Sequence, residues 1–349
     1  MESGIFHSTY EKDMALRHTP IEKARLALII LFLLVFPFLA DNYWLNLANT
    51  IGVVAIGAIG LNILTGFTGQ ISLGQGAFMA VGAYVAALMS IHWGAPMWLT
   101  IPAGAISTAI IGAIFGIPSL RLKGLYLAIA TLAAQEIIIW VITHWDAVTG
   151  GVDALNTKNY LWFGGQNHYF SEFQFYWIIM GLAAITTMAA VNIFRTRVGR
   201  AFIAIRDHDI AAEVMGIDLF RYKMLAFATS SFFVGLTGAL IAHWRQIVTW
   251  ERFTIEVSIF YLAVIIIGGL GSVSGSIYGA IFMVMLPAIL NNIGKALSGV
   301  IPSMDILIPF VQQAVFGLVI ILFLIFEPEG IAKMWKNIRD YFRLWPFSY

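Results

Sequence analysis

Long apolar runs alternate with short polar stretches along almost the whole chain. A helix that crosses a membrane needs about 20 mostly apolar residues, because the hydrocarbon core is about 30 Å thick. The pattern therefore predicts an all-α polytopic membrane protein. We expect ten membrane-spanning helices, at about residues 26–40, 45–64, 77–91, 97–117, 125–144, 175–194, 224–243, 255–267, 277–293 and 306–326. They divide the chain into an N-terminal segment 1–25, a transmembrane domain 26–326 and a tail 327–349.

Two glycine-rich stretches interrupt this pattern, at residues 66–76 and 268–275. Bare backbone at membrane depth is tolerated only where protein covers it or where it lines a water-filled path. The first stretch is therefore either a broken helix beside a substrate pathway or a tight hairpin that lets two helices pack closely. Similar residues follow both breaks, GAFM at 76–79 and GAIFM at 279–283, which indicates an internal repeat with the pathway between its copies.

Polar side chains near the first break, and one carboxyl inside an apolar run, are the candidate pathway residues. These are Asn62, Gln70, Ser72, Gln75 and Glu136. An ionisable residue within a span is a functional candidate because burying its charge in hydrocarbon costs several kcal/mol. The alternatives to contact with a substrate are that the amides bond only to one another, and that the Glu136 carboxyl is structural and bonds to a neighbouring helix.

Residues 195–223 form the largest polar island between spans, with six of the chain's twenty basic residues. Within it, the sequence predicts a short helix from Asp207 to Met215, with Asp207 or Asp209 as N-cap and Gly216 after its end. Ile210, Val214 and Ile217 form an apolar stripe on a helix that is too short to be stable alone. Such a helix needs a surface to lie on.

Composition agrees with a membrane protein, since 60% of the residues are apolar and 11% are charged. The formal net charge of +1 gives no field that would recruit nucleic acid. The basic residues lie unevenly: 16 fall in segments 1–25, 118–124, 195–223 and 327–349, and 4 fall elsewhere. Positive charge favours the cytoplasmic side, so we expect both termini in the cytoplasm.

The chain carries no phosphate-binding loop, no GxSxG motif and no metal-ligand pattern among its seven histidines. With no cysteine, thiolate metal sites and disulfides are excluded. We therefore expect neither a cofactor nor a metal in this chain, and no enzymatic activity of its own. If it moves solute uphill, it draws on an ion gradient or on a separate ATPase.

Several segments resemble the LivM-type permease subunit of branched-chain amino acid ABC importers: LTGFTGQISLGQGAFMAVGAYVAALM, GLYLAIATLAAQEIIIWV, WDAVTGG, VIIIGGLGSVSGSIYGA and, most specifically, GRAFIAIRDHDIAAEVMGIDLFRYK. The resemblance implies a ten-helix type II importer permease in the bacterial inner membrane. It implies a second homologous, LivH-like permease, two cytoplasmic subunits that bind ATP and Mg²⁺, and a periplasmic solute-binding protein as partners.

The resemblance also implies which residues of the polar island meet the ATPase. The short helix is then the coupling helix, with Arg206, Asp207, Asp209, Ile210, Glu213, Val214 and Gly216 as coupling residues. Where family members commonly have Phe-Gly before the glutamate, this chain has Ala134-Gln135 before Glu136. The family also transports urea or short amides and aromatic acids, so the substrate stays open among these and branched-chain amino acids.

Two other classes of function remain as alternatives. An ion-coupled carrier that acts alone would place its coupling chemistry on Glu136, which is the acid well inside a span. A membrane enzyme acting on lipid is disfavoured because no acid/base cluster lies at interface depth.

Overall fold

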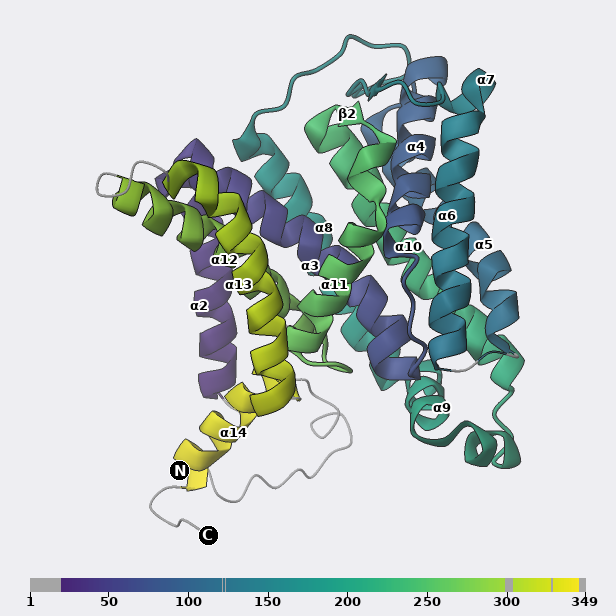
Figure 1. The fold of residues 1–349 in the computed structure, drawn as a ribbon, viewed down its shortest axis with the longest axis vertical. Coiled ribbons are helices and arrows are strands. Elements are labelled where there is room, and N and C mark those ends of the chain that lie inside the picture. Colours follow the sequence, from purple (N-terminus) through teal and green to yellow (C-terminus); the bar gives the residue numbers. More distant parts are fainter. Residues whose placement is uncertain (1–19, 121, 123, 299–303, 328, 345–349) are drawn as a thin grey trace.

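A computed structural model describes residues 20–120, 122, 124–298, 304–327 and 329–344. The first 19 residues of the predicted N-terminal segment, Arg121 and Lys123 of the basic loop, and residues 345–349 of the tail lie outside this range. The described chain is almost entirely helical (Figure 1). In Figure 1, α9 lies at one end of the helical bundle, called the lower end below, and α7 lies at the other, called the upper end.

The long helices follow the predicted spans closely. They are α2 (Pro20–Leu39), α3 (Asn42–Thr68), α4 (Gln75–Trp93), α5 (Met97–Gly116), α6 (Leu125–His144), α8 (Glu172–Arg195), α10 (Leu219–Arg245), α11 (Ile255–Gly268), α12 (Val273–Ser298) and α13 (Met304–Phe326). The remaining elements are η1 (Ile117–Leu120), α7 (Asp146–Thr149), β1 (Leu155–Asn156), α9 (Arg197–Val214), β2 (Ile247–Val248), η2 (Trp250–Phe253) and α14 (Gly330–Leu344).

Eight of the ten predicted spans are helices long and apolar enough to cross a membrane, among the described residues. The other two are present but short. The apolar part of α2 covers Ala24–Leu39, and α11 has 14 residues, which at 1.5 Å per residue gives about 21 Å of a core about 30 Å thick. The expected count of ten spans is thus not confirmed, because α2 and α11 do not reach the length of a complete crossing among the described residues.

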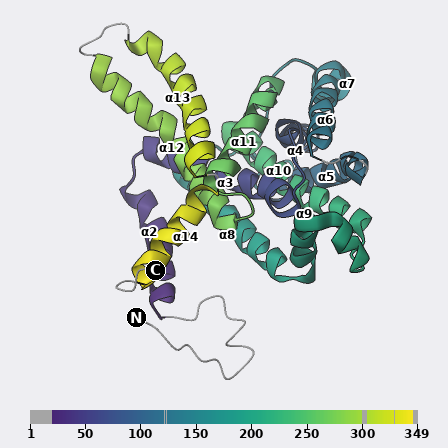
Figure 2. The same cartoon turned by 60° about the horizontal axis from the view of Figure 1, so that its bottom comes forward.

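Helix α3 lies at the centre of the fold, with α10 against it (Figures 1 and 2). Every residue of α3 from Gly52 to Thr68 is buried, which is why this helix is apolar on all sides. Helix α10 packs against α3, α4 and α5, and glycines allow the closest approach. A Cβ on Gly82 of α4 would collide with the backbone oxygen of Gly235 of α10, so glycine is required at this crossing.

The upper end is closed by the segment between α6 and α8. Strand β1 pairs antiparallel with β2, with Leu155 opposite Val248 and Asn156 opposite Ile247. This two-stranded ribbon ties the loop to the end of α10. On the side of the molecule away from α6, α12 and α13 lie side by side (Figure 2). The membrane-length window of α13 has no buried residue.

Candidate functional site: two glycine breaks and the α9 kink

The first glycine break is narrower than predicted, because α3 continues to Thr68 and α4 begins at Gln75. Residues 69–74 run upward beside α6, and α4 starts partway along that helix (Figure 1). Polar side chains of α6 accept hydrogen bonds from the backbone of this segment and of the first turn of α4. Leu73 N donates to Thr131 Oγ1 at 2.9 Å, and Ala77 N donates to Gln135 Oε1 at 2.7 Å. Backbone at this depth needs such partners. The first break is therefore a broken helix inside the bundle and not a terminal hairpin.

Asn62 of α3 binds the second break. Its Nδ2 donates to Ser272 O at 2.9 Å and to Ser276 Oγ at 2.8 Å, and its Oδ1 accepts from Gly271 N at 2.9 Å. A longer contact of 3.4 Å reaches Gly269 O. The side chain is 1% exposed, so no water competes for these bonds. Asn62 thus fastens residues 269–272, between α11 and α12, onto the central helix.

The other uncharged pathway candidates are also buried and bonded within the chain. Gln75 Nε2 donates to Gly57 O at 3.0 Å, Ser72 Oγ accepts from Gly74 N, and Gln70 Nε2 donates to Thr68 Oγ1. Gln70 Oε1 is a buried acceptor without a partner among the described atoms. In this conformation the three polar side chains bond to other residues of this chain. Their contact with a substrate stays a prediction.

Glu136 lies on the exposed face of α6, next to the fully buried Gln135. No hydrogen bond or ion pair joins its side chain to another residue of the described chain. The alternative of a carboxyl bonded to a neighbouring helix of this chain therefore finds no partner in the described part. Exposed apolar residues surround it on the same face, among them Ile137 and Trp140.

The predicted short helix is the second part of α9. The backbone is non-helical at His208, with φ −162° and ψ 99°, and a six-residue helical segment follows it to Val214. His208 Nδ1 accepts from Ala211 N at 3.4 Å, so the cap is His208 and not Asp207 or Asp209 as expected. Gly216 ends the segment with φ 87°, as predicted.

This segment turns apolar side chains outward at the lower end. Ile210 is 60% exposed and Val214 81%, while Ala212 is buried against the protein. Ile217, the third residue of the predicted stripe, is half-buried, and Met215, which is 83% exposed, takes its place on the outward face. Glu213 and Asp207 are exposed beside them. A helix this short with an exposed apolar stripe is incomplete without a covering surface.

Arg206, just before the kink, connects α9 to both breaks. Its Nη1 donates to Gly66 O at 3.2 Å, near the end of α3. A Cβ built on Gly271 would lie 2.8 Å from the same Nη1, so the guanidinium also touches the second break. Its Nε and Nη2 bond Asp207 Oδ1 at 3.0 and 2.9 Å. One side chain thus contacts the kink of α9, the end of α3 and the second break.

A second connection joins the kink to α10. Lys223 Nζ lies 3.7 Å from Asp209 Oδ2, and the side chains are 7% and 19% exposed. Beside this ion pair is a cavity of about 290 Å³ between the kink, Gln70 and Leu127. The coupling segment is thus attached to α10 and has free volume between it and the first break.

The upper end of α10 is fixed by a buried polar cluster. His243 Nδ1 lies 2.7 Å from Asn159 Oδ1, and His243 Nε2 lies 2.6 Å from Thr100 Oγ1. Asn159 Nδ2 also donates to His243 O at 3.1 Å. Glu172 of α8 accepts from Asn46 and Asn49 and from Trp244. No group of three His, Asp or Glu side chains that could hold a metal occurs among the described residues.

Sequence reasoning missed three of these residues. Gln135 stands beside Glu136, and the helical period would have placed one of them inward and the other outward. His208 is a less common cap than its acidic neighbours. Lys223 lies in the polar island, and its burial could not be read from the sequence.

Comparison with known proteins gives one family match. The family described as the permease component of the branched-chain amino acid transport system matches residues 43–324. The chain is 27% identical to the high-affinity branched-chain amino acid transport system permease protein LivM of Escherichia coli over 335 residues, which cover 90% of this chain and 75% of the relative.

Relatives of two kinds appear. The probable LivM permease protein of Methanocaldococcus jannaschii is 25% identical over 83% of this chain and 84% of the relative. The permease protein LivH of Escherichia coli is 25% identical over 79% of this chain and 90% of the relative. No solved structure matches.

Proposed function

The chain belongs to the branched-chain amino acid transport permease family, and we propose that it is one of two paired permeases of an ATP-driven importer. In this proposal it carries branched-chain amino acids across the inner membrane by alternating access. Similarity to both LivM and LivH relatives supports pairing with a second, homologous permease. The chain has no phosphate-binding loop, so ATP and Mg²⁺ act on partner subunits.

The observation that carries this proposal is the exposed apolar stripe of Ile210, Val214 and Met215 on a segment that Arg206 connects to both glycine breaks. Among the described residues, the basic side chains gather in α9, at the start of α10 and in α14, at the lower end, which favours the cytoplasm for that end. An ATPase that covers the stripe would move the kink when it closes on ATP. The movement would pass through Arg206 to residues 66–70 and 269–272, and α4 and α12 would shift with them.

The α6 face that carries Glu136 is the proposed wall of the pathway. A carboxylate facing hydrocarbon at this depth costs several kcal/mol, so the face needs protein or water beside it. The second permease, with a water-filled path between the two chains, provides both. Gln135 supports this assignment because it positions the start of α4 from the other side of the same helix.

Uptake by the reconstituted complex tests the substrate. Both permeases, the ATPases and the binding protein are placed in proteoliposomes, and ATP-dependent uptake is measured for leucine, urea, a short amide and an aromatic acid. Uptake of branched-chain amino acids that requires ATP supports the proposal. Preference for urea or an aromatic acid would move the chain to another substrate class, and uptake by this chain alone would indicate an ion-coupled carrier.

Co-purification tests the coupling segment. Glu213→Arg, or deletion of residues 207–215, is expected to release the ATPase while the helical content of the membrane domain stays unchanged. Asp153→Arg makes the same charge change on an exposed acid at the upper end and is the matched control. Equal retention of the ATPase by Glu213→Arg, the deletion and the control would refute the assignment.

A further inference from the structure

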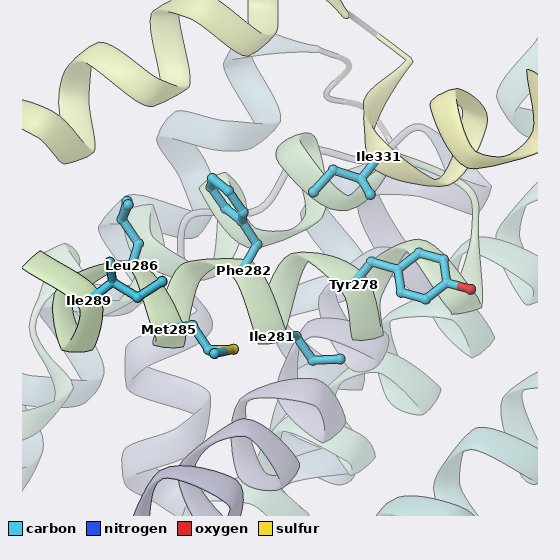
Figure 3. Close-up of a pocket in the computed structure, with 7 residues that line it drawn as sticks. All are labelled: Tyr278, Ile281, Phe282, Met285, Leu286, Ile289 and Ile331. Carbon is cyan, nitrogen blue, oxygen red and sulfur yellow. The ribbon is translucent and has the colours of Figure 1, made fainter. Parts of the chain in front are cut away.

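The side of the molecule away from α6 carries an apolar groove that the transport proposal does not use. The groove has a volume of about 330 Å³ and is lined by Tyr278, Ile281, Phe282, Met285, Leu286, Ile289 and Ile331. Six of these residues follow one another along α12, and Ile331 comes from the first turn of α14 (Figure 3). From Tyr278 to Ile289 the groove runs about 16 Å, which matches one leaflet of a hydrocarbon core about 30 Å thick.

Helix α14 begins where this groove meets the lower end. Ile331, Met334, Trp335, Ile338 and Tyr341 are spaced at i, i+3, i+4, i+7 and i+10, so they share one face of the helix. The first of them lines the groove, whereas Trp335 and Ile338 are 58% and 42% exposed. The apolar stripe of α14 is therefore continuous with the groove and is left largely uncovered by the described chain.

The polar side of α14 is basic. Lys333, Lys336 and Arg339 stand against the single acid Asp340. Lys333 is 3.3 Å from Glu329, and Arg339 is 3.8 Å from Asp340. Both are exposed ion pairs of the kind that contribute little, so an external anion can replace the acidic partner. Lys336 is exposed and has no ion pair to another described residue.

We propose that this region is a binding site for an anionic phospholipid, with one acyl chain in the α12 groove and the phosphate at Lys336 and its basic neighbours. Helix α14 then lies in the interface of the leaflet at the lower end, with Trp335, Ile338 and Tyr341 among the lipids. The lack of ionisable groups other than tyrosine along the groove favours lipid over protein as its occupant. The groove and the apolar stripe carry no ionisable group other than tyrosine, whereas the α6 face carries Glu136 and needs protein or water.

The site is mechanically connected to the second glycine break. A Cβ on Gly330 would lie 2.6 Å from Gly269 Cα, and a Cβ on Gly269 would lie 3.1 Å from Glu329 O. The start of α14 is therefore in contact with residues 268–269. A lipid that fixes α14 in the interface also restrains the backbone that Asn62 holds from the other side.

Fluorescence quenching in nanodiscs tests the site, because the cysteine-free chain accepts single reporters cleanly. The full chain with Ile289→Cys carries a fluorophore at the far end of the groove. Nitroxide-labelled phosphatidylglycerol and phosphatidylcholine are compared as quenchers, and their relative association constants are measured. One interfacial lysine contributes about 1 kcal/mol, so we expect about a fivefold preference for phosphatidylglycerol.

Lys336→Gln is expected to lower that preference about fivefold, and Arg221→Gln, which removes an exposed charge elsewhere at the lower end, is expected to leave it unchanged. Met285→Trp fills the groove and is expected to reduce quenching by both lipids. Equal association of the two lipids with the unsubstituted groove, or an unchanged preference in Lys336→Gln, overturns the proposal. Absence of quenching by either lipid shows that protein covers the groove and also overturns it.

A second pair of reporters tests the placement of α14 independently. A fluorophore at Ile338→Cys should be quenched by nitroxide lipid, whereas one at Asn337→Cys, on the polar side, should be quenched by a water-soluble quencher. Equal exposure of both reporters to the aqueous quencher would show that α14 does not lie in the interface.

Discussion

Replacing Asn62 with leucine removes the side chain that fastens the second glycine break to α3, and the cost can be worked out bond by bond. Leucine is similar in size, so the change removes hydrogen bonds without creating a large cavity. Gly271 N loses its acceptor and becomes a half-buried unpaired donor, which costs up to about 1–3 kcal/mol. Ser272 O keeps its bond from Ser276 N, so its loss is smaller.

The two bonds from Nδ2, to Ser272 O and Ser276 Oγ, add about 0.6 kcal/mol each at the average value for bonds between membrane helices. The total destabilisation of Asn62→Leu is therefore about 2–4 kcal/mol. Gln75→Leu is the matched control, because this buried amide makes a single bond, to Gly57 O, and its removal should cost about 1 kcal/mol.

Reversible unfolding by SDS titration, followed by circular dichroism, measures both free energies of unfolding. Hydrogen exchange of residues 269–276 provides a local readout, and it should become faster in Asn62→Leu but not in Gln75→Leu. If the two variants lose the same free energy, or if exchange at 269–276 is unchanged in Asn62→Leu, then Asn62 does not hold the second break and the reasoning fails.

Three further substitutions give separate expectations. Arg206→Ala removes the bond to Gly66 O, so ATP-dependent uptake should fall at least tenfold while the ATPase still co-purifies; unchanged uptake would show that α9 acts by another connection. Glu136→Gln keeps size but removes charge, and uptake of amino acids should fall while stability stays within about 0.5 kcal/mol, measured by the same SDS titration. A loss of stability without a change in uptake would make Glu136 structural. Gly82→Val forces side-chain atoms into Gly235 O and should destabilise the bundle by more than about 3 kcal/mol, unlike Gly181→Val, where nothing lies within 4 Å of the added Cβ. Equal stability of these two variants would contradict the close packing of α4 on α10.

The sequence predicted the helices well because apolar runs of span length have few alternative structures in a membrane. The spans expected at α2 and α11 are present as helices, but their apolar parts are short, so that they are not confirmed as complete crossings. The kinked α9 was predicted only in its second part. Its first part also carries an apolar stripe, Val198, Phe202 and Ile205, but the surrounding charges obscured that signal.

The residues of the candidate site could be identified from the sequence, but their tertiary contacts could not. Asn62 was identified as a polar residue near the first break, yet its partners lie more than 200 residues away in the chain. Likewise, Arg206 was expected to contact an ATPase, and its bond to Gly66 O is a tertiary contact that no local pattern encodes. Glycine positions indicated where helices break, and only the fold shows that both breaks meet one another.

Helix α10 has 27 residues, which makes it a rod about 40 Å long. Near its lower end Lys223 pairs with Asp209 of the α9 kink, and near its upper end His243 contacts Asn159. A continuous helix is a rigid element, so we expect a displacement of one end to shift the other end as well. In the proposed importer, a solute-binding partner at the upper end and an ATPase at the lower end would therefore both lie next to this one helix, and we expect binding at one end to affect binding at the other.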